Sequence, residues 1–459
     1  MSVSDFKKAQ ELKERRREEA RRQRPRYSQS EIENFGRVNT ALLVITAIML
    51  AYGLIMLFSA SIYQGYAEWG DPLYFVRRQA KINFIGLLFL FFVTYARPIR
   101  FYNRIGLAAI VYVLSILLLA AVILRGTEGV YGATRWLTIG PIQFQPSEAC
   151  KVSCIYCLSA WFPYVRSWQA REKDKAEDPR KFRAAEGRRF IVYPILLIGF
   201  MIFLIVIQPH LSGAIIVFTI SATIFFLARI PWRIWANGLL QLLPLLLIAL
   251  LLLALFFPLV DSEHRSITVY LGEKFAHVTQ RISTFRDPDS ATDDQLHQVL
   301  QSRYALGSGG FFGKGLGMGQ QKSGFLPMVY NDYILPSIGE ELGFLGTLSV
   351  ILLFMGFFLV GTSISLNANS FFAASMSWGC TFLITLQALL NIAVAAEVIP
   401  ATGISLPFFS YGGTASVFFL IAIGFILCVS RTGQRIDPEL RRILDERHEL
   451  LEEGKANPS

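Results

Sequence analysis

A glutamate and a lysine three positions apart are the residues of this sequence most clearly placed for chemistry. Glu148 and Lys151 begin an apolar stretch, and side chains at i and i+3 share one face of a helix, so the two can form an ion pair. An ammonium group inside a membrane helix costs about 3 kcal/mol on insertion scales and is normally retained for a partner or a function. The pair is therefore expected to be either functional or a structural ion pair.

Polar residues upstream of this pair extend the candidate site. Ser147 directly precedes Glu148, Gln145 lies three residues before it, and Arg135 and Trp136 lie 10 and 9 residues before Gln145. Ser147 is also a suitable N-cap residue, and Glu148 in the first turn would suit the positive end of the helix dipole. Arginine binds phosphate through two parallel hydrogen bonds, and an aromatic ring can stack on a sugar, but both residue types also anchor membrane proteins at the interface. Both interpretations of Arg135 and Trp136 stay open.

A glycine-rich stretch around residues 307–317 carries two lysines, Lys314 and Lys322. The nucleotide-binding pattern G-x-x-x-x-G-K-[ST] is not matched, because Gly315 follows Lys314. Backbone N–H groups of glycines together with the two ammonium groups could still bind a pyrophosphate, or the stretch could form a flexible lid.

Two further polar sites stand next to apolar runs. Ser410 lies in a stretch with a glycine turn, residues 406–413, which could line a cavity or satisfy the backbone where a helix ends. Glu340 and Glu341 begin another apolar run, where the helix dipole is a sufficient explanation for them.

The elements that must position these residues are predicted to be membrane helices. The chain of 459 residues is 53% hydrophobic and 17% charged, and its mean hydropathy is +0.43, which is too apolar for an ordinary soluble protein. A spanning helix needs about 20 mainly apolar residues. The sequence therefore predicts an all-α polytopic membrane protein with about ten such helices, at residues 41–59, 81–95, 105–124, 148–165, 190–207, 213–228, 235–260, 337–361, 372–395 and 414–429.

Basic residues predict the orientation of these helices. Short loops rich in lysine and arginine stay in the cytoplasm, and with ten crossings the large basic segments all fall on one side. We expect a cytoplasmic N-terminal tail at residues 1–38, a membrane domain at 39–431 with a large extracytoplasmic loop at 261–336, and a cytoplasmic C-terminal tail at 432–459. Arg77 and Arg78 depart from this pattern and are expected to reach toward lipid headgroups. The expected location is the cytoplasmic membrane.

Composition also excludes several classes of protein. The net charge of +10 is concentrated in loops and tails, which is typical of membrane topology rather than of a nucleic-acid partner. The five cysteines all fall in apolar stretches and are not a disulfide framework. No cofactor is implied by the residues, and participation of a divalent cation is left open.

Taken in order along the chain, these motifs resemble the SEDS family (shape, elongation, division and sporulation), the FtsW/RodA/SpoVE proteins. Several separated motifs in the right order are far more specific than any one of them. The resemblance covers the chain except its two tails. The matching stretches are residues 132–136, 144–151, 208–209, 301–317, 339–346 and 400–413.

The resemblance implies an activity and partners. A SEDS-like protein of this kind would polymerise glycan strands from lipid II at the outer face of the cytoplasmic membrane, usually with a class B penicillin-binding protein as partner. In that reaction a sugar hydroxyl loses a proton to a carboxylate base, and cations stabilise the departing undecaprenyl pyrophosphate. Arg135, Glu148 and Lys151 fall on characteristic family positions, and Arg281 is expected to contribute to substrate binding.

The catalytic aspartate of the family has no direct counterpart in this sequence. When the sequence is aligned without gaps on the family's Asp-Pro and Gln-Ser landmarks, here Asp287-Pro288 and Gln301-Ser302, Ala291 stands at that position. The methyl group of alanine cannot act as a base. A small shift of the loop could bring in a neighbouring carboxylate, since outer loops tolerate changes of register. The candidates are Asp293 first, then Asp289 and Asp294, with Glu148 as a further carboxylate.

Other departures concern residues expected near the same site. His210 stands where the family usually has aspartate, and Met328, Tyr330 and Asn331 replace the usual Glu, His and Thr. Two other functions therefore compete with the glycosyltransferase: a flippase or transporter of lipid-linked precursors, and a non-catalytic scaffold for a penicillin-binding protein. Clustering of the polar residues at the outer face, without an evident inverted repeat, argues against the transporter.

Overall fold

Each of the predicted apolar runs lies within a helix of the computed structural model, to within one residue at its ends, except that the run 190–207 begins in the π-helical turn before its helix. The structure describes residues 36–128, 134–139, 142–208, 210–260, 293–322 and 329–435, with Ser283 and Phe285, and the fold below is that of Val38–Gln434. The helices that contain the apolar runs are α3 (Thr40–Trp69), α4 (Tyr74–Tyr95), α6 (Ile105–Arg125), α7 (Pro146–Glu172), α9 (Tyr193–Ile207), α10 (Leu211–Leu227), α11 (Trp232–Val260), α15 (Ile334–Leu366), α16 (Phe371–Ala395) and α17 (Ala415–Thr432).

Six helices in the described part of the chain are long and apolar enough to cross a membrane, judged by length and composition. They are α3, α6, the continuous helix Pro179–Ile207, α15, α16 and α17, while α10 and part of α11 form shorter apolar helices. α4 and α7 are not among the six, since both carry charged residues within the helix. The protein is thus an all-α multi-pass membrane protein, and the count of ten crossings stays a prediction.

Short elements connect the long helices. They are α5 (Ile99–Tyr102), the strands β1 (Thr127–Glu128), β2 (Thr134–Ile139) and β3 (Ile142–Phe144), the 3-10 turn η1 (Lys173–Lys175), α8 (Pro179–Gly187), the π-helical turn η2 (Arg188–Val192) and α14 (Asp293–Ser308). The strands form an antiparallel sheet in the order β1-β2-β3, with Leu137 opposite Phe144. Because β3 is followed directly by α7, this sheet fixes the segment that leads into the predicted Glu148–Lys151 helix.

Local signals at the helix ends follow ordinary capping chemistry. The Asn39 side chain accepts a hydrogen bond of 3.0 Å from the backbone N–H of Leu42 at the start of α3. α3 ends at Gly70, whose φ of 65° is the left-handed conformation that glycine adopts without a steric penalty. Such ends are predictable from sequence because they depend only on neighbouring residues.

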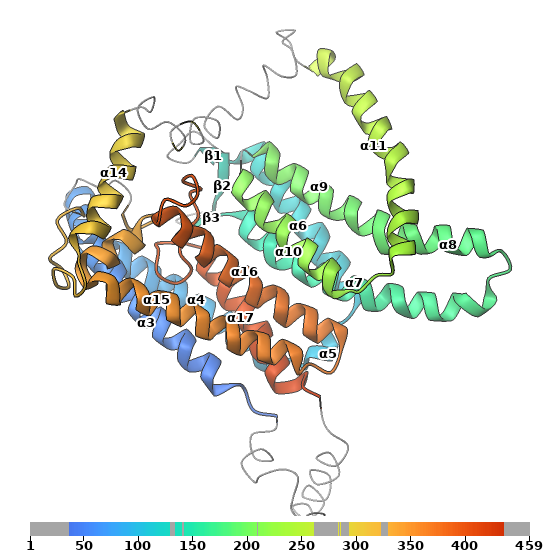
Figure 1. The fold of residues 1–459 in the computed structure, drawn as a ribbon, viewed down its shortest axis with the longest axis horizontal. Helices are drawn as coiled ribbons and strands as arrows, with labels where there is room; N and C mark the ends of the chain where they lie inside the picture. Colours follow the sequence, from blue (N-terminus) through green and yellow to red (C-terminus); the bar gives the residue numbers. More distant parts are fainter. Residues whose placement is uncertain are drawn as a thin grey trace, which may run out of the picture. The chain divides into compact units, whose positions relative to one another are not determined.

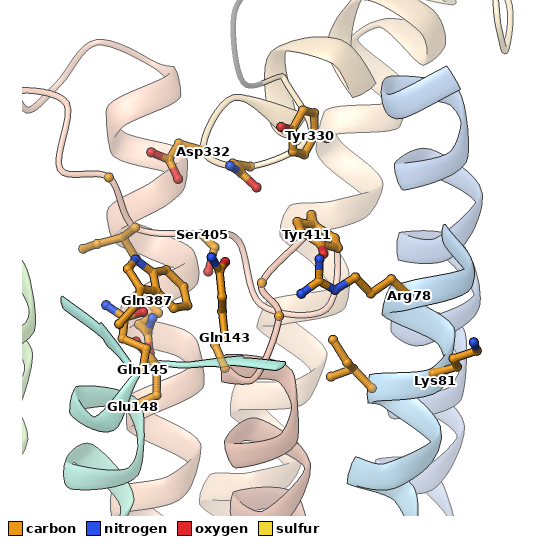
Figure 2. Close-up of a pocket in the computed structure, with 18 of the residues that line it drawn as sticks. Arg78, Lys81, Gln143, Gln145, Glu148, Tyr330, Asp332, Gln387, Ser405 and Tyr411 are labelled. Carbon is orange, nitrogen blue, oxygen red and sulfur yellow. The ribbon is translucent and has the colours of Figure 1, made fainter. Parts of the chain in front are cut away.

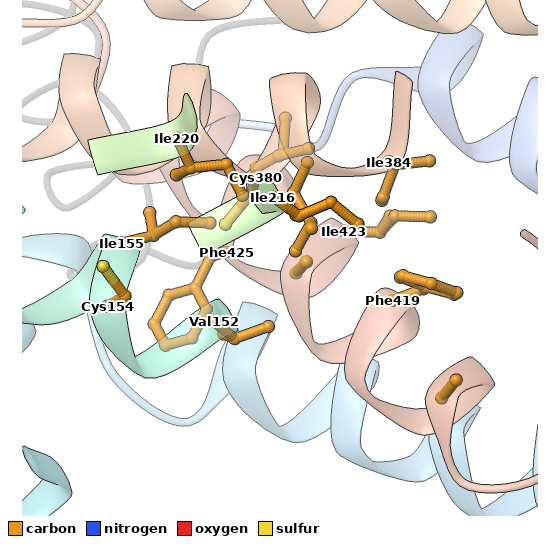
Figure 3. Packing of buried hydrophobic residues seen from close by; sticks show 14 of the residues in the cluster. Val152, Cys154, Ile155, Ile216, Ile220, Cys380, Ile384, Phe419, Ile423 and Phe425 are labelled. Carbon is orange, nitrogen blue, oxygen red and sulfur yellow. The ribbon is translucent and has the colours of Figure 1, made fainter. Parts of the chain in front are cut away.

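The helices pack around one apolar core. α17 packs against α4 and α16, α15 against α16 and α3, and α7 against α6, α10 and α16 (Figure 1). Figure 3 shows side chains from different helices meeting in this core, among them Ile155 of α7, Ile220 of α10, Cys380 of α16 and Ile423 of α17. α4 and α17 approach closely at Gly424, where an added Cβ would lie 3.1 Å from the Cα of Leu90. Small residues allow such close contact between membrane helices.

Candidate active site

The ends of several helices enclose a cavity of about 860 Å³. Its walls come from the first turns of α4, α7 and α17, the last turns of α16, the β2–β3 strands and the loops 330–332 and 403–413 (Figure 2). α4, α7 and α17 start at this cavity whereas α16 ends at it, so α16 runs in the opposite direction to the other three. The polar and charged side chains of the lining are Asp71, Tyr74, Arg77, Arg78, Lys81, Gln143, Gln145, Glu148, Lys151, His210, Tyr330, Asn331, Asp332, Gln387, Ser405 and Tyr411.

The predicted Glu148–Lys151 pair lies at the buried end of this cavity. The two side chains are only 7% and 2% exposed, and Lys151 Nζ lies 2.6 Å from Glu148 Oε1. Lys151 also donates a hydrogen bond of 3.0 Å to Gln387 Oε1 of α16. Glu148 Oε2 is buried and has no hydrogen-bond partner among the described residues. A buried carboxylate oxygen without a hydrogen bond is costly unless a ligand uses it. The ion pair engages Oε1 of Glu148 and leaves Oε2 available to a ligand in the cavity.

The start of α7 differs by one detail from the prediction. Gln145, not Ser147, is the N-cap residue, and Pro146 occupies the first helical position, where its missing N–H is not needed. Ser147 is buried in the first turn, and its Oγ has no hydrogen-bond partner among the described residues. Gln145 itself lines the cavity. Ser147 is not a lining residue, and its role in substrate binding stays a prediction.

The sheet before α7 brings the other upstream residues to the site. Trp136 of β2 and Gln143 of β3 line the cavity. Arg135 is half-buried in β2, and its charge acts on His210 at the start of α10. The sequence motif around Arg135 and the helix of Glu148 are therefore brought together by the strands, as their order along the chain suggested.

α4 contributes three cations, of which Arg77 and Arg78 were expected to reach toward lipid headgroups. Arg77, Arg78 and Lys81 line the cavity together with Tyr74, whose OH accepts a hydrogen bond of 3.3 Å from Arg78 Nη1. Arg77 Nη1 lies 3.1 Å from Asp71 Oδ2. The Arg78 guanidinium points toward Tyr411 in Figure 2. The spacing of Arg77, Arg78 and Lys81 could have indicated that they share one side of a helix. Nothing in the sequence indicated that this side faces the cavity of the Glu148–Lys151 pair.

Aromatic rings form the wall near Arg78. The ring of Phe75 contacts the rings of Tyr330 and Tyr411. Its centroid lies 4.4 Å from that of Tyr330 and 5.2 Å from that of Tyr411. The backbone N–H of Tyr411 donates a hydrogen bond of 2.7 Å to the carbonyl of Tyr330, which ties the two loops together. Burial raises the pKa of Tyr330 to about 12, so its phenol is neutral at physiological pH. Tyr330, one of the departures from the family pattern, is thus a cavity residue.

The glycine-rich stretch lies apart from the cavity lining and surrounds two buried carboxylates of α15. Lys314 Nζ lies 2.8 Å from Glu340 Oε1, and Lys322 Nζ lies 2.6 Å from Glu341 Oε1. Glu340 also accepts backbone N–H bonds from Gln320 and Gln321. The two lysines are therefore engaged with these carboxylates, and their contact with a pyrophosphate stays a prediction.

The helix-dipole explanation of Glu340 and Glu341 is wrong. α15 begins at Ile334, several residues before them, and both carboxylates are 1% exposed or less. Glu341 accepts hydrogen bonds from the Ser59 hydroxyl of α3 at 2.7 and 2.6 Å and from the backbone N–H of Gly317 at 3.0 Å. These carboxylates thus attach the glycine-rich stretch to the two helices.

The remaining predicted residues are placed as follows. Ser410 is buried in a turn, where its Oγ accepts a hydrogen bond of 2.8 Å from the backbone N–H of Leu406, so it stabilises the loop behind Tyr411. Asp293 and Asp294 are the first residues of α14. Arg281, Asp289, Ala291 and Met328 lie outside the described residues. Among the described residues, no group of three His, Cys, Asp or Glu side chains could hold a metal ion.

The family comparison agrees with this arrangement of motifs. The family model described as "Cell cycle protein", FtsW/RodA/SpoVE, matches residues 40–435. The chain belongs to this family, the SEDS proteins. The probable peptidoglycan glycosyltransferase FtsW of Neisseria gonorrhoeae is 32% identical over 430 residues, which is 88% of this chain and 86% of that protein. The stage V sporulation protein E of Bacillus subtilis is 32% identical over 394 residues, 85% of this chain and 96% of that protein.

Solved structures show that the SEDS fold extends over most of the chain. A chain of a peptidoglycan synthase complex, solved to describe how polymerization and crosslinking are coordinated, matches with a TM-score of 0.59 at 24% identity and covers 86% of this SEDS protein and 98% of that chain. The rod shape determining protein RodA of Thermus thermophilus matches with a TM-score of 0.55 at 23% identity, covering 87% and 98%. The predicted fold class and family are confirmed.

Proposed function

We propose that this SEDS protein is a peptidoglycan glycosyltransferase that polymerises glycan strands from lipid II. The observation that carries the proposal is the cavity in which a buried Glu148–Lys151 pair faces a wall of cations on α4. Two relatives that align along most of the chain are named as a peptidoglycan glycosyltransferase and a sporulation protein. Buried ionisable residues in membrane helices are retained for function.

The chemistry of the cavity suits transfer of a sugar from a lipid-linked pyrophosphate. An attacking sugar hydroxyl forms the new bond at the anomeric carbon while the bond to the pyrophosphate oxygen breaks, and the departing charge needs cations. Lys151, Arg78 and Lys81 supply positive charge from two walls. Ile82 and Ile85 continue the lining along α4, and Ile85 is 41% exposed on the outside of the helix. A polyprenyl chain could therefore leave the cavity toward the bilayer along this helix.

The base that accepts the hydroxyl proton is proposed to come from the segment before or at the start of α14. Asp293 is the first candidate, followed by Asp289 and Asp294, because Ala291 occupies the position of the family's catalytic aspartate. Glu148 is the next candidate if these fail, since its Oε2 lies unpaired at the cavity. A general base must reach the hydroxyl within about 3 Å or through one water.

The proposed location is the cytoplasmic membrane with both termini in the cytoplasm. With this orientation the basic loop 166–189 lies inside, in agreement with the positive-inside rule. The cavity and the segment 261–336 then lie at the outer face, where lipid II is polymerised. A class B penicillin-binding protein is the proposed partner, supported by the similar fold of a chain in a peptidoglycan synthase complex.

Polymerisation of lipid II by the purified protein, with and without its penicillin-binding protein, tests the function. We expect glycan strands from the parent protein and a loss of about 10²–10⁴-fold in rate for the Asp→Ala variant that removes the base. Retention of full rate by all three Asp variants would move the base to Glu148. If the parent makes no glycan with its partner while Ala291→Asp restores synthesis, the scaffold function is correct. Lipid II translocation into proteoliposomes without polymerisation would instead support the flippase.

A further inference from the structure

His210 is a buried histidine at the cavity with no assigned role. It lies between α9 and α10, is 8% exposed, and lines the same buried end of the cavity as Glu148, Lys151 and Gln387. Its Nδ1 is buried and has no hydrogen-bond partner among the described residues. A buried polar ring without a partner costs free energy, so the position calls for a ligand or a structural explanation.

The orientation of the ring follows from Gly213. A Cβ added at Gly213 would lie 2.7 Å from both Nδ1 and Cε1 of His210 and 3.2 Å from Cγ. The Nδ1 edge of the ring therefore rests on the first turn of α10, and the opposite edge with Nε2 is turned away from that turn. The first turn of a helix presents N–H groups and partial positive charge. A lone pair on Nδ1 is favoured there, which places the ring proton on Nε2.

Burial and the neighbouring cations keep the ring neutral. Arg135 of β2 and Lys151 of α7 are the cations that act on it, and Glu148 is the carboxylate paired with Lys151. Burial first, and then these two cations, lower the pKa of His210 well below its ordinary value. An uncharged imidazole with its proton on Nε2 is a hydrogen-bond donor toward the cavity.

Lys151 has a third N–H donor at the same place, beyond the two that its hydrogen bonds use. An ammonium group has three N–H donors, and Lys151 directs two of them to Glu148 and Gln387. Two cations and one carboxylate leave a net positive charge beside the ring. An aspartate at position 210 would instead add a negative charge and accept hydrogen bonds only. Histidine at this position therefore turns the buried end of the cavity into a site rich in donors.

We propose that Nε2–H of His210 is a neutral hydrogen-bond donor to a pyrophosphate oxygen in a subsite completed by Lys151 and Arg135. This proposal rests on the proposed function, because it names the residue of this chain that binds the pyrophosphate of the lipid-linked substrate. His210 is a binding residue that takes no proton during the reaction.

Binding of undecaprenyl pyrophosphate to the purified full-length protein in nanodiscs tests the proposal without requiring polymerisation. His210→Gln places an amide N–H near the position of Nε2, whereas His210→Asn places it near Nδ1. We expect His210→Gln to bind within about threefold of the parent and His210→Asn to bind roughly 10- to 100-fold more weakly, the range of a hydrogen bond to a charged group. His210→Asp should bind more weakly still, because its carboxylate competes for the two cations.

Loss of binding in the Gln variant equal to that in the Asn variant would overturn the proposal, as would unchanged binding in both or a preference for Asn. Undecaprenol, which lacks phosphate, must show no dependence on residue 210, and an equal dependence also overturns the proposal. Inorganic pyrophosphate distinguishes a site for the free anion from one that needs the lipid. A parent protein that binds undecaprenyl pyrophosphate in this pattern but makes no glycan refutes the proposed function alone.

Discussion

At the scale of single residues, the buried ion pair combines two roles that a mutation can separate. Lys151 neutralises Glu148 and contacts Gln387, so the ammonium group both satisfies buried polarity and supplies charge to the cavity. Removing one member of a buried pair leaves an uncompensated charge, which typically costs about 3–5 kcal/mol. Replacing both members by neutral groups of similar shape avoids that cost.

We expect Lys151→Met to lower both the thermal stability and the polymerisation rate, because Glu148 is left buried without a partner. The double variant Glu148→Gln/Lys151→Met should recover most of the stability yet remain inactive. Melting curves of the purified proteins and lipid II polymerisation measure the two effects separately. If the double variant polymerises at the parent rate, the pair is structural.

His210 gives a second prediction at this scale, which concerns pH. An ordinary histidine with a pKa of about 6.5 would gain charge between pH 8 and pH 6 and bind an anion more tightly. Because burial and the neighbouring cations lower its pKa, His210 stays neutral over this range. The ratio of undecaprenyl pyrophosphate affinities of the parent and His210→Gln should therefore be constant from pH 8 to pH 6. A ratio that rises on acidification would show that the ring becomes charged in the complex.

At the scale of elements, the glycine-rich stretch is held to α15 by a break within that helix. Gly343 has φ 68° and ψ −161°, a conformation that side-chain-bearing residues rarely adopt. A Cβ at this position would lie 2.4 Å from the backbone nitrogen of Gly313. The close approach allows Phe344 N–H to donate a hydrogen bond of 2.9 Å to the carbonyl of Gly310.

Gly343→Ala is therefore expected to destabilise the protein. The backbone conformation alone costs about 1–3 kcal/mol for alanine, and the contact with Gly313 adds to it. Gly356→Ala in the same helix is the matched control, because an added Cβ there meets only Ile45 Cδ1 at 3.5 Å. Thermal melting should fall clearly for the first variant and stay near the parent for the second. Equal melting temperatures would mean that the break in α15 has no energetic importance.

At the scale of the whole molecule, topology decides on which side of the membrane the cavity opens. Phe312 lies in the glycine-rich stretch and is 78% exposed, and Lys175 lies in the basic loop and is exposed. We expect an impermeant maleimide to label Phe312→Cys in intact spheroplasts, and Lys175→Cys only after permeabilisation. The parent protein supplies the background, since its five cysteines are buried or half-buried. The reversed pattern would invert the proposed orientation.

The sequence by itself determined the family, the helices and the centre of the site. Apolar runs of membrane length predict helices whatever their neighbours, because a backbone without water must form its own hydrogen bonds. The position of Lys151 in such a run predicted a partner or a function for the same reason: a buried charge is too costly to keep unpaired and unused.

Only the tertiary structure decided how the other charges are used. Arg78 and Lys81 line the cavity, whereas Lys314 and Lys322 are paired with Glu340 and Glu341. All are cations near the same predicted face of the membrane, and their local sequence gives no sign of the difference. The side that a helix turns toward its neighbours, and the carboxylate that a lysine meets, depend on packing between segments that are far apart in the chain.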